Sequence, residues 1–229
     1  MKSKKRKLLV YDLGLIEYEK AWKIQKELHR KRILGKTNDT LLICEHPHTY
    51  TLGKIAEKKN LLLNKKELQQ KHIAVFDIDR GGDITYHGPG QIIGYSILNL
   101  TDWKKDAHLY LRSLEEVLIK TCYNYGINNA TRKKNYTGVW INDRKICAIG
   151  IKISRWITMH GFAFNVNTDL KYFDGIIPCG IKNKEVTSLD KELNKKKNIN
   201  EVKEKVIKNF ISVFEYDVIN IKSFSTKLA

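Results

Sequence analysis

Residues 138–153 read GVWINDRKICAIGIKI, with an Asn-Asp pair between two apolar runs. Runs rich in β-branched residues on either side of such a pair predict two strands joined by a tight turn. Strands joined in this way are antiparallel neighbours. The stretch therefore indicates a sheet that contains antiparallel pairs, and not one built only from parallel strands and crossover helices.

The segments on either side of this hairpin alternate between strand and helix patterns. Hydrophobic periodicity predicts further strands at 41–53, 73–82, 91–100 and 156–167, amphipathic helices at 16–34, 106–125 and 201–214, and a short polar helix at 64–72. Because strands outnumber helices and come in hairpin-like pairs, we expect an α+β fold. Its mixed or antiparallel sheet would be flanked by helices in a single domain over 1–229, with a basic N-terminal arm at about 1–7.

The composition and the positions of the cysteines indicate in which cellular compartment we expect the protein. The chain has 229 residues, 42% of them apolar, and no run of eighteen apolar residues, so we expect no membrane span. The N-terminus lacks the apolar region of a signal peptide. The cysteines (Cys44, Cys122, Cys147 and Cys179) are far apart and form no CxxC pair. We therefore expect a reducing cytoplasm, no disulfide framework and no metal site.

The chain is strongly basic, with 42 Lys and Arg against 25 Asp and Glu, a net charge of +17. A surface of this kind attracts polyanions or acidic proteins. The alternative is a lysine-rich, solvated surface without a partner, because the lysines are scattered and many lie beside asparagine. Zinc-finger spacing and an RNA-binding aromatic signature are both absent from the sequence, so nucleic acid is not the expected partner.

Residues 80–91, which read RGGDITYHGPGQ, form a glycine segment between two predicted strands. Glycine allows positive φ and close approach of a ligand to the backbone. The segment is neither GxGxxG nor a P-loop, which disfavours a nucleotide site. Its two glycine bends would hold Thr85, Tyr86 and His87 between them. A tight connection between strands is the simpler alternative.

A cysteine lies in an irregular stretch near the end of the chain. Residues 173–189 read FDGIIPCGIKNKEVTSL and place Cys179 between Pro178 and Gly180. A lone cysteine is usually a small buried apolar residue, but this loop setting favours a reactive thiol. A thiol with an ordinary pKa of about 8.5 is only a few per cent ionised at pH 7, so a neighbouring cation would be needed.

Residues 144–150, which read RKICAIG, offer such a cation. On a regular strand Lys145 and Cys147 would share one face. A lysine that enters an apolar strand is unusual, because lysine is rarely buried without a partner. The spacing alone is better explained by a Lys145 that ends the Asn-Asp turn and points to solvent.

Taken in order, four motifs resemble those of the bacterial lipoate-biosynthesis octanoyltransferases. They are RGGDITYHGPGQ, RKICAIG, HGFAFNVNTDL, and IPCG followed by TSL, and the resemblance extends over about residues 10–215. Two positions depart from the usual pattern. Cys147 replaces a small residue such as alanine or glycine, and Ser96 replaces a common proline.

The resemblance implies a fold shared with biotin protein ligases and lipoate-protein ligases. It implies transfer of an octanoyl group from the phosphopantetheine of acyl carrier protein to a lysine ε-amine. The acceptors would be lipoyl domains of 2-oxoacid dehydrogenases and the glycine-cleavage H protein. Cys179 would carry the acyl group as a thioester, with Lys145 as its partner. The implied acyl-binding residues are Arg80, Gly81, Gly82, Asp83, Ile84, Thr85, Tyr86, His87, Ala148, Ile149, Gly150, Gly161, Phe162 and Ala163.

No cofactor, metal or nucleotide is expected, because a thioester donor is already activated, and we expect a monomer. Two alternatives share the implied fold: an ATP-dependent lipoate-protein ligase, and a lipoyl or octanoyl amidotransferase that moves the acyl group between proteins. The HGPGQ motif disfavours both. A nucleic-acid-binding module is a third alternative, but it gives no reason for Cys179 in its Pro-Gly setting.

Overall fold

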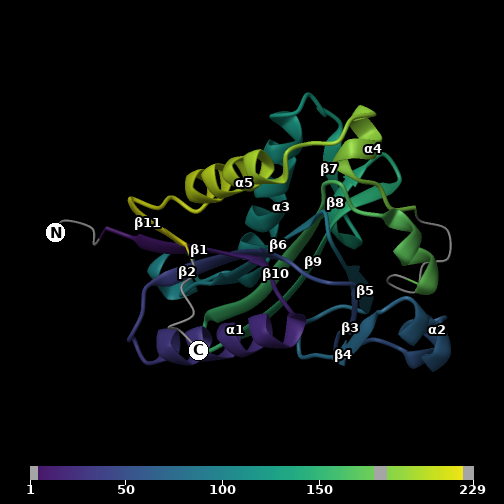
Figure 1. The fold of residues 1–229 in the computed structure, drawn as a ribbon. Coiled ribbons are helices and arrows are strands. Elements are labelled where there is room, and N and C mark those ends of the chain that lie inside the picture. The colour runs from purple at the N-terminus through teal and green to yellow at the C-terminus, as the bar shows by residue number, and fades with distance from the viewer. Residues whose placement is uncertain (1–4, 178–184, 224–229) are drawn as a thin grey trace.

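The computed structural model describes residues 5–177 and 185–223, and its centre is a large mixed sheet (Figure 1). Its spatial order is β11 (Val218–Ser223), β1 (Lys7–Leu15), β2 (Asp39–Glu45), β6 (Gln91–Ile97), β10 (Ile157–Asn165), β9 (Arg144–Ser154), β8 (Tyr136–Ile141) and β7 (Ala130–Lys133). The β11–β1 and β1–β2 pairs are parallel, and the remaining pairs are antiparallel.

A smaller sheet lies beside the large one and is formed by β4 (Ala74–Asp77), β3 (Thr49–Leu52) and β5 (Ile84–His87). The α-helices are α1 (Tyr18–Ile33), α2 (Lys65–Gln70), α3 (Ala107–Tyr123), α4 (Leu189–Leu193) and α5 (Ile199–Val213). Short 3₁₀ helices are η1 (Lys58–Asn60), η2 (Leu100–Asp102) and η3 (Leu170–Gly175).

Helices cover both faces of the large sheet, with α1 on one face and α3 and α5 on the other (Figure 1). Each strand contributes side chains to the cores on both faces of the sheet, because successive residues point to opposite faces. On β2, Leu41 and Ile43 join the core beneath α3 and α5, whereas Leu42 and Cys44 join the core beneath α1. A third apolar cluster packs around the smaller sheet. The predicted α+β class with a mixed sheet flanked by helices is confirmed.

Several predicted strand boundaries were wrong. The stretch 41–53 is two strands in different sheets, β2 and β3, separated by residues 46–48. Pro47 lies at the break and has no N–H to donate to a ladder. The predicted strand 73–82 contracts to β4, which is mostly exposed. Within the glycine segment, residues 84–87 are not a loop but strand β5, paired with β3. Strands β1, β7 and β11 were not predicted.

Candidate functional site

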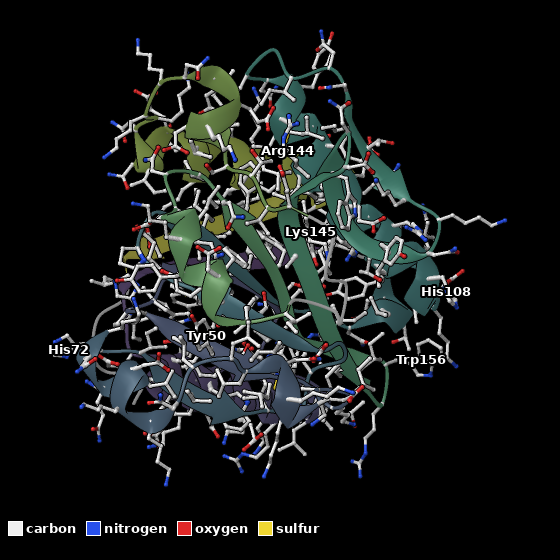
Figure 2. The ribbon with its side chains drawn as sticks, turned by 90° about the vertical axis from the view of Figure 1, so that its right-hand side faces the viewer. Tyr50, His72, His108, Arg144, Lys145 and Trp156 are labelled. Atoms are coloured by element: carbon white, nitrogen blue, oxygen red, sulfur yellow. The ribbon has the colours of Figure 1, made fainter. Side chains whose placement is uncertain are left out.

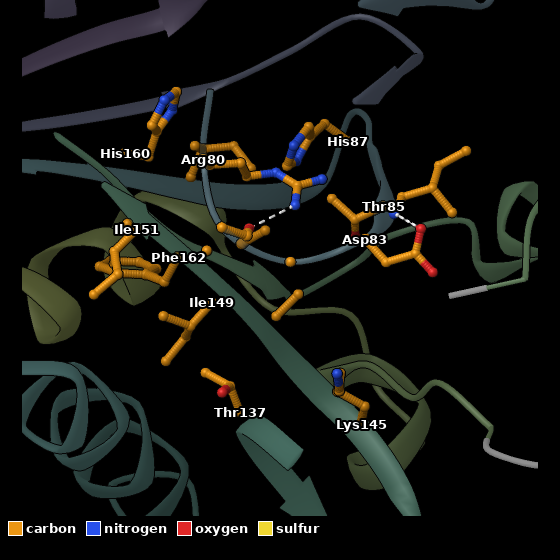
Figure 3. Close-up of a pocket in the computed structure, with 18 of the residues that line it drawn as sticks. Arg80, Asp83, Thr85, His87, Thr137, Lys145, Ile149, Ile151, His160 and Phe162 are labelled. Carbon is orange, nitrogen blue, oxygen red and sulfur yellow. Dashed lines mark hydrogen bonds between the residues drawn. The ribbon is translucent and has the colours of Figure 1, made fainter. Parts of the chain in front are cut away.

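A cavity of about 650 Å³ lies between the glycine segment and strands β9 and β10. It contains nearly all the site residues expected from the motifs. These are Arg80, Gly81, Gly82, Asp83, Ile84, Thr85, His87, Lys145, Ala148, Ile149, Gly150, Gly161, Phe162 and Ala163. Figure 3 shows Lys145 at one end of the β9 wall, and Ile151 and His160 towards the other. Ile151 lies six positions after Lys145 along the strand, a span of roughly 20 Å.

Tyr86, one of the implied acyl-binding residues, is the exception among the described residues and does not line the cavity. On β5 the side chains alternate, so Thr85 and His87 line the cavity while Tyr86 points into the apolar cluster of the smaller sheet. Its hydroxyl lies 2.7 Å from Nδ1 of His48. A Cβ on Gly88 would lie 1.8 Å from this hydroxyl, which explains the glycine there.

Cys179 lies outside the described residues, but both ends of the stretch that contains it are fixed near the cavity. On one side, the Ile177 N–H donates to the carbonyl of Asn60 (2.8 Å). On the other side, Lys145 donates its N–H to Glu185 O and accepts from Thr187 N–H, both at 2.9 Å. The expected partnership of Lys145 with Cys179 therefore stays a prediction.

The glycine segment is fastened directly to the wall formed by β9. The Gly81 N–H donates to the carbonyl of Ile151 (2.9 Å), and the buried Arg80 side chain packs against Gly150. A Cβ on Gly150 would lie 2.8 Å from Arg80 Cδ and 2.9 Å from Gly81 O. Glycine is required here because another backbone and an arginine stem come so close.

Arg80 begins a chain of hydrogen bonds through buried side chains. Its Nη2 donates to the carbonyl (2.7 Å) and to Oγ1 (3.0 Å) of Thr51. That hydroxyl lies 3.2 Å from Nε2 of His87, and Nδ1 of His87 lies 3.0 Å from Oε1 of Gln91. Since a carboxamide oxygen only accepts, Nδ1 carries the proton and Nε2 accepts from Thr51. Burial lowers the pKa of His87 well below its ordinary value.

The same chain continues beneath the cavity to the residues beside Lys145. Gln91 Nε2 donates to Asn165 Oδ1 (2.8 Å), and Asn165 Nδ2 donates to the carbonyl of Thr187 (2.9 Å). Thr187 is in turn bonded to the backbone of Lys145. The polar groups of one wall are therefore linked to the position of Lys145, and both ring nitrogens of His87 are used in holding the wall together.

Lys145 lies in the cavity wall and does not simply point to solvent, as the spacing alone had favoured (Figures 2 and 3). Its Nζ lies 4.7 Å from the ring centroid of Trp140. The pairing of β8 with β9 shifts register between Val139–Cys147 and Trp140–Lys145. This bulge breaks the regular alternation, so the expected shared face was wrong: Lys145 lines the cavity, and Cys147 packs in the core beneath α3 and α5.

Cys147 is a poor nucleophile in this position. Its side chain is fully buried, and burial raises the pKa of the thiol well above its ordinary value, although the charge of Lys145 acts in the opposite direction. Burial likewise raises the pKa values of Cys44 and Cys122. A thiol reacts as the thiolate, so none of these three buried cysteines suits covalent catalysis.

The sequence reasoning missed an ionic cluster at the end of the cavity remote from Lys145. His160 Nε2 lies 2.8 Å from Asp79 Oδ1, and Lys152 Nζ lies 2.5 Å from Oδ2. The hydrogen bond from His160 and the one from Lys152 lower the pKa of Asp79, while burial lowers that of His160. His160 has φ +62°, unusual for a residue other than glycine, and its N–H donates to Gln25 Oε1 (3.1 Å). The HGFAFNVNTDL motif contains His160, but the implied site residues did not include it, and no sequence signal identified Asp79 as its partner.

Among the described residues, we find no group of three or more His, Cys, Asp or Glu arranged to hold a metal ion. None of the described helices is long and apolar enough to cross a membrane.

The chain is similar to known proteins in both sequence and fold. Residues 17–211 match the family described as the lipoyl protein ligase A/B catalytic domain. The chain is 49% identical to the octanoyltransferase of Flavobacterium psychrophilum, over 91% of this chain and 97% of that protein. It is 48% identical to the octanoyltransferase of Flavobacterium johnsoniae, over 93% of this chain and 99% of that protein.

Two kinds of solved structure share the fold at low sequence identity. A lipoate-protein ligase A bound with ATP superposes with a TM-score of 0.77 at 14% identity, over 98% of this chain and 91% of the other. The biotin protein ligase of Aquifex aeolicus, in complex with biotin and ATP, gives a TM-score of 0.55 at 16% identity, over 90% and 70%.

Proposed function

The chain belongs to the lipoyl protein ligase A/B catalytic-domain family and, within it, to the octanoyltransferases, and we propose that its octanoyl donor is acyl carrier protein. The resemblance inferred from the four motifs is thereby confirmed, and the enzyme is an acyltransferase. The proposed acceptors are lysine ε-amines of lipoyl domains, including those of 2-oxoacid dehydrogenases, and of the glycine-cleavage H protein. The proposed intermediate is a thioester on Cys179.

The observation that carries this proposal is the place of Lys145 in the cavity wall. It is paired through its backbone to residues 185–187, which follow Cys179 closely in the sequence. Most of the cavity wall near the middle of β9 and β10 is apolar, with Ile149 and Phe162 facing it. An alkyl chain would gain free energy by leaving water for such a wall.

The chemistry needs only a thiol and a base in this arrangement. The Cys179 thiolate attacks the thioester carbonyl of octanoyl-phosphopantetheine, and the carbon–sulfur bond to pantetheine breaks. The Lys145 ammonium gives its proton to the departing thiolate. A substrate lysine, as its free amine, then attacks the acyl-cysteine and passes a proton to the Lys145 amine, while Cys179 leaves as thiolate. Both groups return to their starting states.

Intact-mass spectrometry after incubation with octanoyl-acyl carrier protein tests the proposal. We expect one added octanoyl group, released on adding a lipoyl domain, and peptide mapping should place it on Cys179. Cys179→Ala should abolish both the adduct and turnover. Turnover without any adduct would contradict the thioester intermediate.

The fold alone does not distinguish this reaction from that of a ligase, since a lipoate-protein ligase bound with ATP shares it. We therefore expect transfer in nucleotide-free buffer with octanoyl-acyl carrier protein as donor. Strict dependence on ATP and free octanoate would identify a ligase. Transfer only from an octanoylated protein would identify an amidotransferase.

A further inference from the structure

Trp140 is a buried tryptophan whose ring faces cations. The side chain is 1% exposed. The Nζ atoms of Lys145 and Lys133 lie 4.7 and 5.1 Å from its ring centroid. Apolar burial alone does not explain this arrangement, because the indole would lose as much contact with water if it packed against aliphatic side chains.

The backbone itself brings Trp140 and Lys145 together. The two residues are directly paired across β8 and β9, at the point where the register shifts. Directly opposed side chains on neighbouring antiparallel strands lie about 4.5–5.5 Å apart at Cβ. The bulge that moves Lys145 into the cavity wall therefore also places it on the ring.

A buried carboxylate and a glycine fix this part of β8. Oε1 of Glu115, which is fully buried on α3, accepts from the Gly138 N–H at 3.0 Å. A Cβ on Gly138 would lie 2.4 Å from the carbonyl oxygen of Cys147 and 3.6 Å from Cε of Lys145. The close approach of the Cys147 carbonyl therefore excludes a side chain at Gly138, and the Lys145 stem lies within van der Waals contact of the same point.

The orientation of the indole is also set. Its Nε1 donates to the carbonyl of Tyr136 (3.3 Å), so the ring edge is held by the backbone. Lys133, the second cation at the ring, is ion-paired with Asp143. The ring quadrupole attracts an ammonium and has little attraction for a neutral amine, more so where water is excluded.

We propose that Trp140 is a positioning residue whose indole face holds the Lys145 ammonium at the cavity wall, oriented to serve the reactive thiol. The inference rests on the proposed function, in which Lys145 donates a proton to the departing pantetheine thiolate. The four-carbon stem of lysine is flexible, and contact with the ring face limits the orientations of its ammonium. Holding the Lys145 ammonium in place before the reaction favours proton donation to the departing pantetheine thiolate, because that step requires the charged form of the lysine.

The test introduces tryptophan carrying one, two and three ring fluorines at position 140 alone. Fluorine weakens the ring quadrupole while nearly preserving its size, so the core stays filled. The rate constant for formation of the octanoyl-enzyme from octanoyl-pantetheine should fall stepwise, by about tenfold over the series. KM for this donor and the melting temperature should change little. A rate independent of fluorination would overturn the inference.

Two variants keep this result separate from the proposed function. Lys133→Met, which removes the other cation at the ring, should leave activity and its dependence on fluorination unchanged. If the rate no longer depended on fluorination in Lys133→Met, the effect of fluorine would act through Lys133, and the inference would fail. Lys145→Met should abolish turnover. Full activity of Lys145→Met would overturn the proposed role of Lys145, whereas an inactive Lys145→Met with a flat fluorine series would overturn only the role of Trp140.

Discussion

Cys147 shows how a thiol close to a lysine can remain unreactive. It lies two residues from Lys145, yet it is fully buried in the core beneath α3 and α5, and burial raises the pKa of its thiol. Its Sγ donates to the carbonyl of Ala148 (3.4 Å). Desolvation of the thiolate therefore outweighs the favourable charge nearby.

Cys147→Ala should leave octanoyl transfer intact, because the thiol does not line the cavity. The lost sulfur leaves a small gap in the core, and we expect the free energy of unfolding to fall by about 1 kcal/mol. Urea unfolding and the intact-mass assay measure the two effects. Mapping of the octanoyl group to Cys147 in the parent enzyme would refute both this prediction and the choice of Cys179.

Single residues were predictable where a motif kept them together in the chain. The resemblance assigned Arg80 to His87 and Ala148 to Gly150 to one site, and all of them except Tyr86 line the cavity. Tyr86 was misplaced since the alternation of a strand had not been recognised there. The partner of His160, Asp79, is 81 residues away, and no local pattern connects the two. The face of Lys145 depended on a bulge that has no sequence signature.

At the scale of elements, the contact between the glycine segment and β9 is the feature most sensitive to substitution. Gly150→Ala forces a Cβ to within 2.9 Å of both Arg80 Cδ and Gly81 O, and Gly81 O is backbone that cannot rotate away. We expect a loss of about 1–3 kcal/mol in the free energy of unfolding. The KM for the octanoyl donor should also rise, because the segment would move away from the cavity.

Gly81→Ala is the matched comparison for stability. Neither glycine has positive φ, and the nearest atom to an added Cβ at Gly81 is Ile151 O at 3.4 Å, an ordinary contact. Its cost in thermal unfolding should be clearly smaller. Equal losses in the two variants would show that close approach at Gly150 is not the reason for glycine.

The amphipathic helices were predictable from their apolar spacing, whereas strands β1, β7 and β11 were not predicted. Helix α3 was predicted from its apolar spacing, and the structure adds that the Asp106 carboxylate caps it by accepting from the N–H groups of His108 and Leu109. By contrast, β7 and β11 are short strands at the two edges of the large sheet. Edge strands bury fewer apolar side chains, so their hydrophobic pattern is weak, and pairing with distant residues decides that they form.

At the scale of the whole molecule, buried histidines connect stability to pH. Burial lowers the pKa of His46 from 6.5 to about 4 and also lowers those of His87 and His160. Nδ1 of His46 donates to Ile16 O (2.6 Å), and its Nε2 accepts from the Tyr95 hydroxyl (2.7 Å), which requires the neutral ring. Between pH 6.5 and 4 the unfolded chain therefore binds protons that the folded chain does not.

We expect the free energy of unfolding to fall as the pH is lowered from 7 to 5, with about 2 kcal/mol from His46 alone. Urea unfolding at the two pH values measures the difference. His46→Asn, which keeps a donor for Ile16 O but cannot titrate, should lower stability at pH 7 and flatten the pH dependence. The same slope in this variant would assign the acid sensitivity to other groups.

The net charge of +17 leads to a prediction about the carrier protein. Exposed charges more than about 8 Å apart are largely screened at 0.15 M salt. If the carrier is recognised through its acidic surface, its KM should rise from low to high salt, while that of octanoyl-pantetheine should stay constant. If the KM for the carrier protein does not change with salt, the excess of lysine reflects the composition of the chain and does not contribute to carrier binding.

The pairing of β1 with β11 has a consequence for synthesis of the protein. Lys7 pairs with Val218, and Arg6 and Asp217 are bonded although 211 residues separate them. At about 5–20 residues per second, the ribosome delivers β11 roughly 10–40 s after β1. During that time the outer edge of β1 offers unpaired N–H and C=O groups to any other strand. A chain that ends at residue 217 should therefore accumulate in inclusion bodies, and a soluble truncated protein would argue against this.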